Sequence, residues 1–307
     1  MDAARLNPEI RKAFRNIPNP PVTTGFGRAL VRTGLKLVQA PKLPDGMTRE
    51  IITLPNGLPI RVFTPGGGGT GAALLNIHGG GMVIGAAIQD DASVIQTAHE
   101  LNIVVFSGEY RLSPEHPFPA PLDDCHVAWE WVQSNAVARG VDPDRIAIGG
   151  QSAGGGLAAG LVLRLHDEGG TQPVAQWLFC PMLDDRTAAN RELDNVKHYL
   201  WNNRSNLAGW RSYLNGTPGQ LTVSEYAAPA RRADLTGLPP TWIGAGDIEL
   251  FYDEDRAYAA ALTAAGVDTT LDVVSGAPHG FEAVVGSSQL AKAYTSRARV
   301  WLGRHLH

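Results

Sequence analysis

Ser152 is the residue around which chemistry can be built in this chain. It lies at the centre of the sequence Gly-Gln-Ser-Ala-Gly at residues 150–154, a G-x-S-x-G motif. A serine hydroxyl is a poor nucleophile unless a base within hydrogen-bond reach accepts its proton, and a carboxylate must hold that base in the correct tautomer. Ser152 would therefore perform acyl transfer only if the fold brings an imidazole and an acid to it.

The motif alone is weak evidence, because 35 of the 307 residues are glycine and 12 are serine. Random placement of these residues gives roughly 0.2 matches in a chain of this composition. The flanking sequence is more informative. Residues 145–149 form an apolar run of strand length, and residues 157–166 have the spacing and residue types of a helix. A serine in the sharp turn between them has the geometry of a nucleophile elbow, with a helix N-terminus pointing at its hydroxyl.

His279 is the histidine best placed to serve Ser152. Of the nine histidines, it is the one that lies after Ser152 and at the end of a predicted strand, at 269–274. An acidic cluster after the predicted strand at 241–245 offers the carboxylate. Most of the other histidines fall on predicted helices, in a polar segment or in the tail: His99, His126, His166, His198, His305 and His307.

Eight short apolar runs predict the strands that would carry these residues. The first two, at 51–54 and 60–63, are joined by an Asn-Gly turn and predict a hairpin. Strands and helices then alternate, which predicts an α/β fold with a mostly parallel sheet. The other strands are expected at 73–77, 103–106, 145–149, 174–180, 241–245 and 269–274, and helices near 89–101, 121–138, 157–166, up to 265, and 286–303.

The chemically suggestive groups each follow a predicted strand. The sequence His-Gly-Gly-Gly at 78–81 follows the strand at 73–77, and Ser152, the acidic cluster and His279 follow three others. Because the carboxyl ends of parallel strands share one edge of a sheet, where ligands bind, we expect these groups to lie together. Consecutive glycines also let backbone N–H groups face a ligand without side chains in the way.

Two segments interrupt or precede the alternation. Residues 1–48 are rich in proline, with helices expected near 8–16 and 25–39, and they form either a lid or a plain brace. Residues 184–226 are polar with spaced aromatic residues, as expected of an insertion that covers a substrate. We therefore predict one domain over 1–307, with cap segments at 1–48 and 184–226 and a catalytic core at 49–183 and 227–307.

Composition excludes several classes of protein. With 44% hydrophobic and 18% charged residues and a net charge of −4, the chain does not look like a nucleic-acid binder. Residues 1–50 nevertheless carry nine Lys and Arg and four Asp and Glu, a net +5, which favours a solvated helical face over an acidic partner. Cys125 and Cys180 are predicted to be buried thiols. Since no signal sequence or membrane-spanning run is evident, we expect a cytoplasmic protein. The spacing of the two cysteines does not suggest a metal site, and we expect neither a metal nor a cofactor.

Four blocks of the sequence resemble the hormone-sensitive-lipase family of bacterial-type esterases, in the α/β-hydrolase superfamily. They lie at 78–81, at 110–120, at 150–155, and from Leu-Pro-Pro-Thr at 238–241 through Asp-Glu at 253–254 to His-Gly-Phe at 279–281. The order serine, acid, histidine is also that of the superfamily. The resemblance implies an α/β-hydrolase fold with about eight strands and a helical cap.

The resemblance also implies roles for particular residues. Ser152 would be the nucleophile and His279 the base. Glu115 and Asp123 would either brace the site or serve the structure alone. The oxyanion would be held by the backbone N–H groups of Gly80, Gly81 and Ala153, on a loop shaped by His78 and Gly79.

The acid is the point at which this sequence departs from the family. The family pattern places its aspartate at the position of Glu249, and a glutamate can also orient an imidazole. Asp247 is the alternative, but choosing it would move Gly246 and the Asp-Glu pair at 253–254 out of register. A second departure is Gln151, where the family commonly has Asp or Thr.

The predicted function is that of a serine carboxylesterase acting on short- to medium-chain esters through an acyl-enzyme intermediate. An amide or lactone hydrolase with the same triad is the alternative, and a non-catalytic small-molecule receptor is the remaining one, because the fold alone does not prove catalysis. The resemblance further implies a homodimer that forms through the free edge of the last strand, at 269–274.

Overall fold

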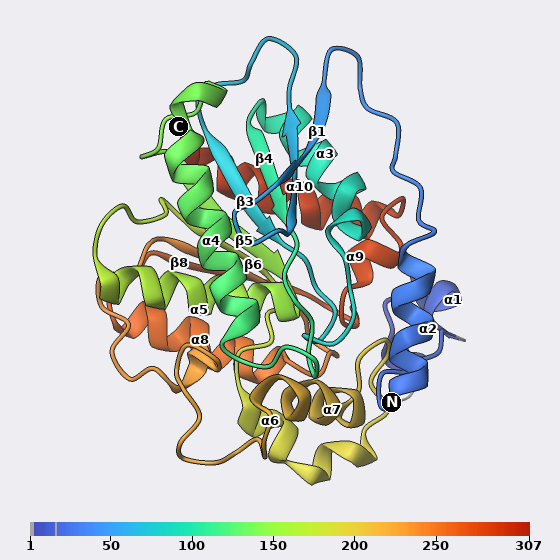
Figure 1. Ribbon diagram of the computed structural model, residues 1–307. Coiled ribbons are helices and arrows are strands. Elements are labelled where there is room, and N and C mark those ends of the chain that lie inside the picture. Colours follow the sequence, from blue (N-terminus) through green and yellow to red (C-terminus); the bar gives the residue numbers. More distant parts are fainter. Residues whose placement is uncertain (1–2, 16) are drawn as a thin grey trace.

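An eight-stranded sheet runs through the computed structural model, which describes residues 3–15 and 17–307 (Figure 1). The strand order is β1-β2-β4-β3-β5-β6-β7-β8. All eight predicted strands are present within a few residues of their expected bounds, so the predicted fold class is confirmed. The strands are β1 (Thr48–Thr53), β2 (Pro59–Thr64), β3 (Ala73–Ile77), β4 (Val104–Gly108), β5 (Ile146–Gln151), β6 (Gln176–Phe179), β7 (Thr241–Gly246) and β8 (Thr269–Val274).

The strand directions bring the candidate residues to one edge. β1 and β2 form an antiparallel hairpin and β2 pairs antiparallel with β4, whereas all pairs from β4 to β8 are parallel. Ile77 at the end of β3 lies beside Gly150 near the end of β5, and Gly246 at the end of β7 lies beside Val274 at the end of β8. The loops that follow these strands therefore emerge side by side.

Alternating side chains of the strands form a core on each face of the sheet. In β4, Val104 and Phe106 belong to one core and Val105 to the other, as expected for strands buried on both sides. The first core is covered by α4 (Ala120–Asn135), α5 (Ala153–Glu168) and α8 (Tyr252–Ala264), and the second by α3 (Asp91–Leu101) and α10 (Gln289–Leu306) (Figure 1).

The segment between β6 and β7 is helical and lies over the edge where the candidate residues emerge. It contains α6 (Asp185–Ala189) and α7 (Asn203–Leu214). The Trp201 ring, just before α7, fills the space that a Cβ on Gly81 would occupy, 2.2 Å from its nearest atom. Gly209 of α7 packs against the Gly81 carbonyl oxygen, which a Cβ on Gly209 would approach to 2.8 Å.

The N-terminal helices are shorter than predicted. α1 spans Arg11–Phe14 and α2 spans Gly25–Leu35, against expected helices near 8–16 and 25–39; residue 16 lies outside the described residues. Thr24 starts α2, since its side chain accepts a hydrogen bond from the Gly27 N–H at 3.1 Å. After Leu35 the backbone N–H groups of residues 36–38 donate to carbonyls three residues earlier, a tighter 3₁₀-type pattern, so the α-helix ends earlier than its apolar spacing suggests.

The C-terminal helix is displaced relative to the prediction. The loop after β8 first forms the short helix α9 (Phe281–Val284), and α10 then begins after Ser288, whose hydroxyl accepts from the Ala291 N–H at 3.1 Å. Within residues 3–15 and 17–307, no helix combines the length and the apolar character that crossing a membrane would require.

Candidate active site

Ser152 lies in a strained turn between β5 and α5. Its backbone has φ 56° and ψ −119°, a conformation that is costly for any residue with a Cβ. Three backbone hydrogen bonds hold it there. The Ser152 N–H donates to the Phe179 carbonyl at 2.8 Å, and the Ser152 carbonyl accepts from the Gly156 and Met182 N–H groups at 3.0 and 2.9 Å. The sheet and helix α5 together fix the direction of the hydroxyl.

The two motif glycines are required by close packing. A Cβ on Gly154 would lie 2.1 Å from the Ile77 carbonyl oxygen, and a Cβ on Gly150 would lie 2.4 Å from the Gly154 carbonyl oxygen. The sharp turn therefore has no room for side chains on either side of the serine. Through these contacts the turn also touches the end of β3.

The structure brings Ser152, His279 and Glu249 into one chain of hydrogen bonds. His279 Nε2 lies 2.9 Å from the Ser152 hydroxyl oxygen, and His279 Nδ1 lies 2.5 Å from Glu249 Oε2. All three residues are buried, at 5–7% exposure. The Phe251 ring packs edge-on against the imidazole at 5.2 Å between centroids. This geometry allows the imidazole to take the serine proton while the carboxylate fixes its tautomer.

Asp247, the alternative acid, points elsewhere. Its carboxylate accepts a hydrogen bond from the Gly276 N–H at 2.6 Å and one from the Ser275 hydroxyl at 3.0 Å. It therefore shapes the turn that follows β8, behind the imidazole. Glu249, two residues further along the loop after β7, is the acid that reaches His279.

Two buried groups near Glu249, Asp255 and Cys180, have raised pKa values. Asp255 is completely buried, and burial together with the charge of Glu249 raises the pKa of Asp255 well above its ordinary value. Burial likewise raises the pKa of the Cys180 thiol, and both cysteines are buried as predicted.

Ligand atoms of Cys180, Glu249 and His279 lie within 4.8 Å of one another, but a metal ion bound there would compete with the His279–Glu249 hydrogen bond.

The glycine loop after β3 lies directly beside the serine. A Cβ on Gly79 would be 3.5 Å from the Ser152 Cβ. Gly80 and Gly81 have φ values of 129° and 61°, and the Gly80 carbonyl accepts from the Ile84 N–H at 3.0 Å, which closes the loop. Ala153 is the first residue of α5, where a helix leaves its N–H without an intrahelical partner.

His78 packs against this glycine loop and binds its backbone. It is fully buried, with Nδ1 2.8 Å from the Gly79 carbonyl oxygen and Nε2 3.2 Å from Glu109 Oε2. Its ring stacks on Tyr110, whose hydroxyl donates to the His78 carbonyl at 3.0 Å. Burial opposes a charge on the imidazole, but the Glu109 carboxylate outweighs it, so the pKa of His78 is raised. The sequence pattern did not point to Glu109.

Glu115 and Asp123 do not brace the triad, which corrects one of the two expectations for them. Glu115 pairs with Arg32 of α2 at 3.0 Å, and Asp123 pairs with Arg164 of α5 at 2.7 Å. Both carboxylates are substantially exposed, at 56% and 46% of their side chains. Their role is to tie helices to the core, and their place next to a family motif does not bring them to the site.

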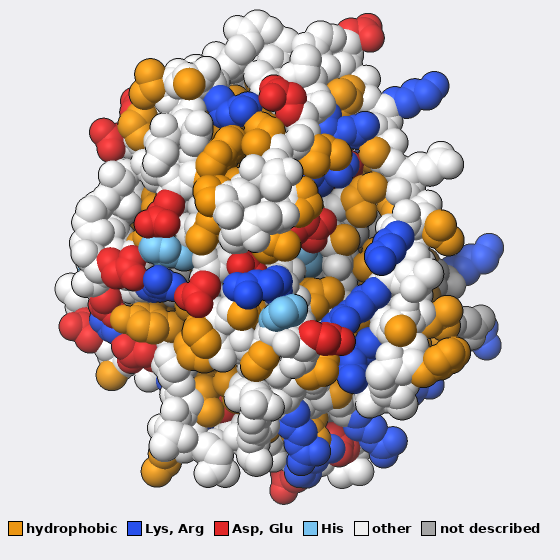
Figure 2. Space-filling view, in the orientation of Figure 1, with side chains coloured by type: hydrophobic (Ala, Val, Ile, Leu, Met, Phe, Trp, Pro, Cys, Tyr) orange, Lys and Arg blue, Asp and Glu red, His pale blue; other side chains and the backbone are white. Residues whose placement is uncertain are grey.

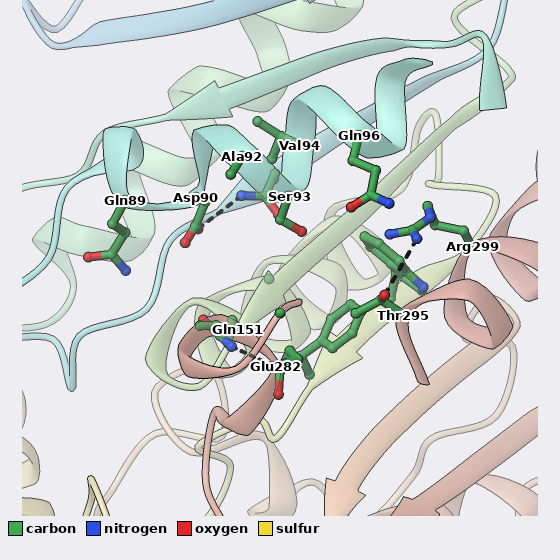
Figure 3. A pocket seen from close by; sticks show the side chains of 16 residues that line it. Gln89, Asp90, Ala92, Ser93, Val94, Gln96, Gln151, Glu282, Thr295 and Arg299 are labelled. Atoms are coloured by element: carbon green, nitrogen blue, oxygen red, sulfur yellow. Dashed lines mark hydrogen bonds between the residues drawn. The ribbon is translucent and has the colours of Figure 1, made fainter. Parts of the chain in front are cut away.

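Gln151 has a partner that the sequence did not reveal. Its Nε2 donates to Glu282 Oε1 at 2.5 Å, and both side chains form part of the wall of a cavity of about 300 Å³ between α3, β5 and α9 (Figure 3). On the opposite wall, Gln89 Nε2 donates to the Gly79 carbonyl at 3.3 Å. Gln151 is the residue before Ser152, and Glu282 lies three residues after His279. Their hydrogen bond therefore connects the turn that carries Ser152 with the segment that carries His279.

The cap places a second imidazole near the site. His198 is buried, and burial, together with the positive charge of Arg5, lowers its pKa to about 4. Two residues later, Leu200 has a φ of 62°, and Trp201 then covers Gly81. His198 was not predicted as a site residue, because it falls in the polar segment at 184–226.

This chain is similar to known esterases. The α/β-hydrolase fold family matches residues 74–283. Carboxylesterase NlhH of Mycobacterium tuberculosis is 32% identical over 93% of this chain and 92% of its own length. Among solved structures, a bacterial heroin esterase has a TM-score of 0.89 at 36% identity, covering 99% of both chains. An esterase of the bacterial hormone-sensitive lipase family has a TM-score of 0.80 at 29% identity, covering 98% of this chain and 99% of the other.

Proposed function

Since this chain belongs to the α/β-hydrolase family, among its hormone-sensitive-lipase-like carboxylic ester hydrolases, we propose that Ser152, His279 and Glu249 are its catalytic triad. The observation that carries this proposal is the unbroken hydrogen-bond chain from the serine hydroxyl through the imidazole to the glutamate, at 2.9 and 2.5 Å. No cofactor is needed for the reaction that follows.

In the acylation step, the Ser152 oxygen attacks the ester carbonyl while His279 Nε2 takes the hydroxyl proton. The Ser152–carbonyl bond forms, the carbonyl π electrons move onto oxygen, and His279 then gives its proton to the leaving alcohol as the C–O bond breaks. Glu249 holds the Nδ1–H and stabilises the transient imidazolium. Water activated by His279 later cleaves the acyl-serine bond by the same route in reverse.

The developing negative charge on the carbonyl oxygen would be held by the N–H groups of Gly80, Gly81 and Ala153. In comparable sites, one such donor contributes about 2.7–4 kcal/mol to transition-state stabilisation. His78 and Gly79 would keep the loop in place, because His78 is locked between Gly79, Glu109 and Tyr110.

The substrates we propose are short- to medium-chain esters. Ser152 is only 7% exposed, and Trp201 closes over the glycine loop, so the space beside the nucleophile is limited. Residues 1–48 and 184–226 would act as cap segments of a single domain, with the core at 49–183 and 227–307. The contact of Trp201 and Gly209 with Gly81 supports this division.

Pre-steady-state kinetics test the proposal. A short-chain aryl ester should release its alcohol in a burst equal to the enzyme concentration, and Ser152→Ala should abolish the burst and lower kcat by about 10⁶-fold. Ser93→Ala, an exposed serine on α3, is the matched control and should behave as wild type. An unchanged rate in Ser152→Ala would refute the assignment. Aryl amides and lactones of the same acyl length, assayed in parallel, decide between ester hydrolysis and the two related activities.

The proposal extends to a homodimer formed through β8. Within the described residues, β8 pairs only with β7, so the outer edge of the strand has backbone groups without strand partners. A groove of about 520 Å³ runs along this edge and is lined by the exposed side chains of Val273 and Val300. Antiparallel pairing of two β8 strands around a two-fold axis would cover both the free strand edge and the groove beside it. Sedimentation velocity should show a dimer that Val273→Lys converts to a monomer, and a monomeric wild type would exclude it.

A further inference from the structure

Helix α2 exposes its apolar side chains to water. Phe26 is 82% exposed, Leu30 is 60% exposed and Leu37, two residues beyond the helix, is 79% exposed. Their spacing places them on one face of the helix, and Ala29 and Thr33 lie between them and are exposed as well. We call Phe26, Ala29, Leu30, Thr33 and Leu37 the α2 stripe.

The opposite face of α2 holds the polar contacts with the protein. Arg32 donates to the Val83 carbonyl at 2.9 Å and to the Ser113 carbonyl at 2.7 Å, and it pairs with Glu115. Arg28 donates to the Val22 carbonyl at 3.0 Å. An amphipathic helix of a globular protein ordinarily buries its apolar face. In α2, Val31 packs partly buried against the core, but Phe26 and Leu30 face water. The hydrogen bonds of Arg32 to the distant carbonyls of Val83 and Ser113 fix this orientation.

Positive charge surrounds the α2 stripe. Residues 10–44 contain seven Lys and Arg and no Asp or Glu. Figure 2 shows apolar and cationic side chains side by side over α1 and α2. The exposed cations in and around this region are Arg5, Lys12, Arg15, Lys36 and Lys42.

We propose that the α2 stripe and these cations bind an anionic lipid surface. An exposed apolar helical face flanked by Lys and Arg is the pattern of helices that lie in a membrane interface, with the apolar side chains among the acyl chains and the cations at the headgroups. A second protein would need an apolar groove of matching shape within an acidic surface to satisfy both features, whereas an anionic bilayer offers apolar chains and negative headgroups over its whole area. The charge also fits, because the segment 1–50 is +5 in a chain of −4.

The same contacts orient the bound protein. Arg32 fastens α2 to the carbonyl of Val83, two residues after the glycine loop, so α2 lies on the cap side of the molecule. Docking on the α2 stripe would therefore bring the cap, and not the opposite end of the sheet, to the lipid. The binding itself does not depend on the catalytic proposal, and Ser152→Ala should bind lipid as wild type does.

Vesicle co-sedimentation of the full chain tests this. At low ionic strength, we expect the protein to partition at least tenfold more strongly to phosphatidylcholine vesicles containing about 30% phosphatidylglycerol than to pure phosphatidylcholine, and added salt should weaken binding. Phe26→Ser with Leu30→Ser should lower partitioning about tenfold or more. Lys36→Glu with Lys42→Glu should lower partitioning at least five-fold for each lysine replaced and weaken the preference for anionic lipid.

Matched controls come from exposed residues elsewhere. Leu221→Ser, at a leucine that is 96% exposed, and Lys292→Glu on α10 should bind as wild type does. Circular dichroism and melting temperature establish that each variant is folded.

Three results would overturn the proposal. One is a wild type that stays in the supernatant with anionic vesicles at low salt. Another is binding that neither pair of substitutions weakens. The third is a wild-type dimer that Phe26→Ser with Leu30→Ser converts to a monomer, without lipid binding, since a second copy would then cover the α2 stripe.

Discussion

The edge of the sheet that carries Ser152 and the helix α2 beside it are built in opposite ways. At the edge, polar groups are buried and bound to one another, as the 2.9 and 2.5 Å contacts of His279 show. On α2, leucine and phenylalanine side chains face water, and the guanidinium of Arg32 faces the protein.

This difference shows where each region finds its partners. A buried polar group is costly unless it is hydrogen-bonded, so the triad residues stabilise one another within the chain. The α2 stripe has no such internal partner among the described residues, and the partner we propose for it lies outside the chain. The triad can be tested by substitutions that remove a hydrogen-bond partner within the chain. The α2 stripe can be tested by comparing membranes with and without anionic lipid.

Among the groups that support Ser152, the acid of the triad is expected to give the largest effect. Glu249→Gln keeps the shape of the side chain but favours the wrong imidazole tautomer, and it should lower kcat/KM by about 10⁴-fold. Asp247→Asn disturbs only the turn at Ser275 and Gly276, so kcat/KM should fall by less than about tenfold. Steady-state kinetics on one short-chain aryl ester compares the two variants. If Asp247→Asn is the inactive one, the geometry around His279 has been misassigned.

A smaller loss is expected where the cap meets the glycine loop. Gly81→Ala would place a methyl group 2.2 Å from the Trp201 ring, at a φ of 61° that alanine adopts with strain. We expect kcat to fall by about 10²-fold, because one oxyanion donor would move. Gly34→Ala on α2, where nothing lies within 4 Å of the added carbon, should leave kcat unchanged. Equal kcat values for Gly81→Ala and the wild type would show that the loop does not hold the oxyanion.

The fold could be predicted from the sequence alone, and so could the strands whose ends carry Ser152, Glu249 and His279. Continuous apolar runs predicted β2 to β7 because these strands are buried on both faces of the sheet, whereas the edge strands β1 and β8 are partly exposed and were predicted from shorter runs. The elbow could be predicted because its glycines and its flanking strand and helix are local in the chain.

The remaining features depend on contacts between distant segments. The spacing on α2 predicted a helix, but periodicity does not say which face is buried. Glu115 lies in a family motif and Asp123 shortly after it, which suggested a place near the site, but their ion pairs with Arg32 and Arg164 show that they serve helix packing. The role of Gln151 could not be predicted from the sequence, because its hydrogen-bond partner Glu282 lies 131 residues away in the chain.

A loss of about tenfold is expected when the Gln151–Glu282 hydrogen bond is removed. Gln151→Met keeps the volume of the side chain but cannot donate, so the loop of His279 would lose its connection to the elbow. Gln96→Met is a close control, because Gln96 lines the same cavity and donates to Glu100 at 2.7 Å, away from the triad. The measurement is kcat/KM against pH for both variants. A fall shared by both would assign the effect to the cavity and not to this hydrogen bond.

The smallest effect concerns stability in the cap. Burial lowers the pKa of His198 from 6.5 to about 4, so between these values the unfolded chain binds a proton that the folded chain does not. The contribution of His198 to the free energy of unfolding therefore falls as the pH is lowered through this window and is constant above it. The melting temperature of His198→Asn should fall less than that of wild type between pH 7 and pH 4.5, by a few degrees. His99→Asn, at an exposed position, should follow wild type, and parallel curves for all three proteins would contradict the buried, neutral state of His198.

The most direct test of the triad is covalent labelling by an aryl phosphonate, followed by peptide mass spectrometry. One phosphonyl group per chain should appear on the peptide that contains Ser152, and Ser152→Ala should remain unlabelled. Labelling should be slowed far more by Glu249→Gln than by Asp247→Asn, because only Glu249 holds the imidazole. Label on another residue, or full labelling of Ser152→Ala, would contradict the account.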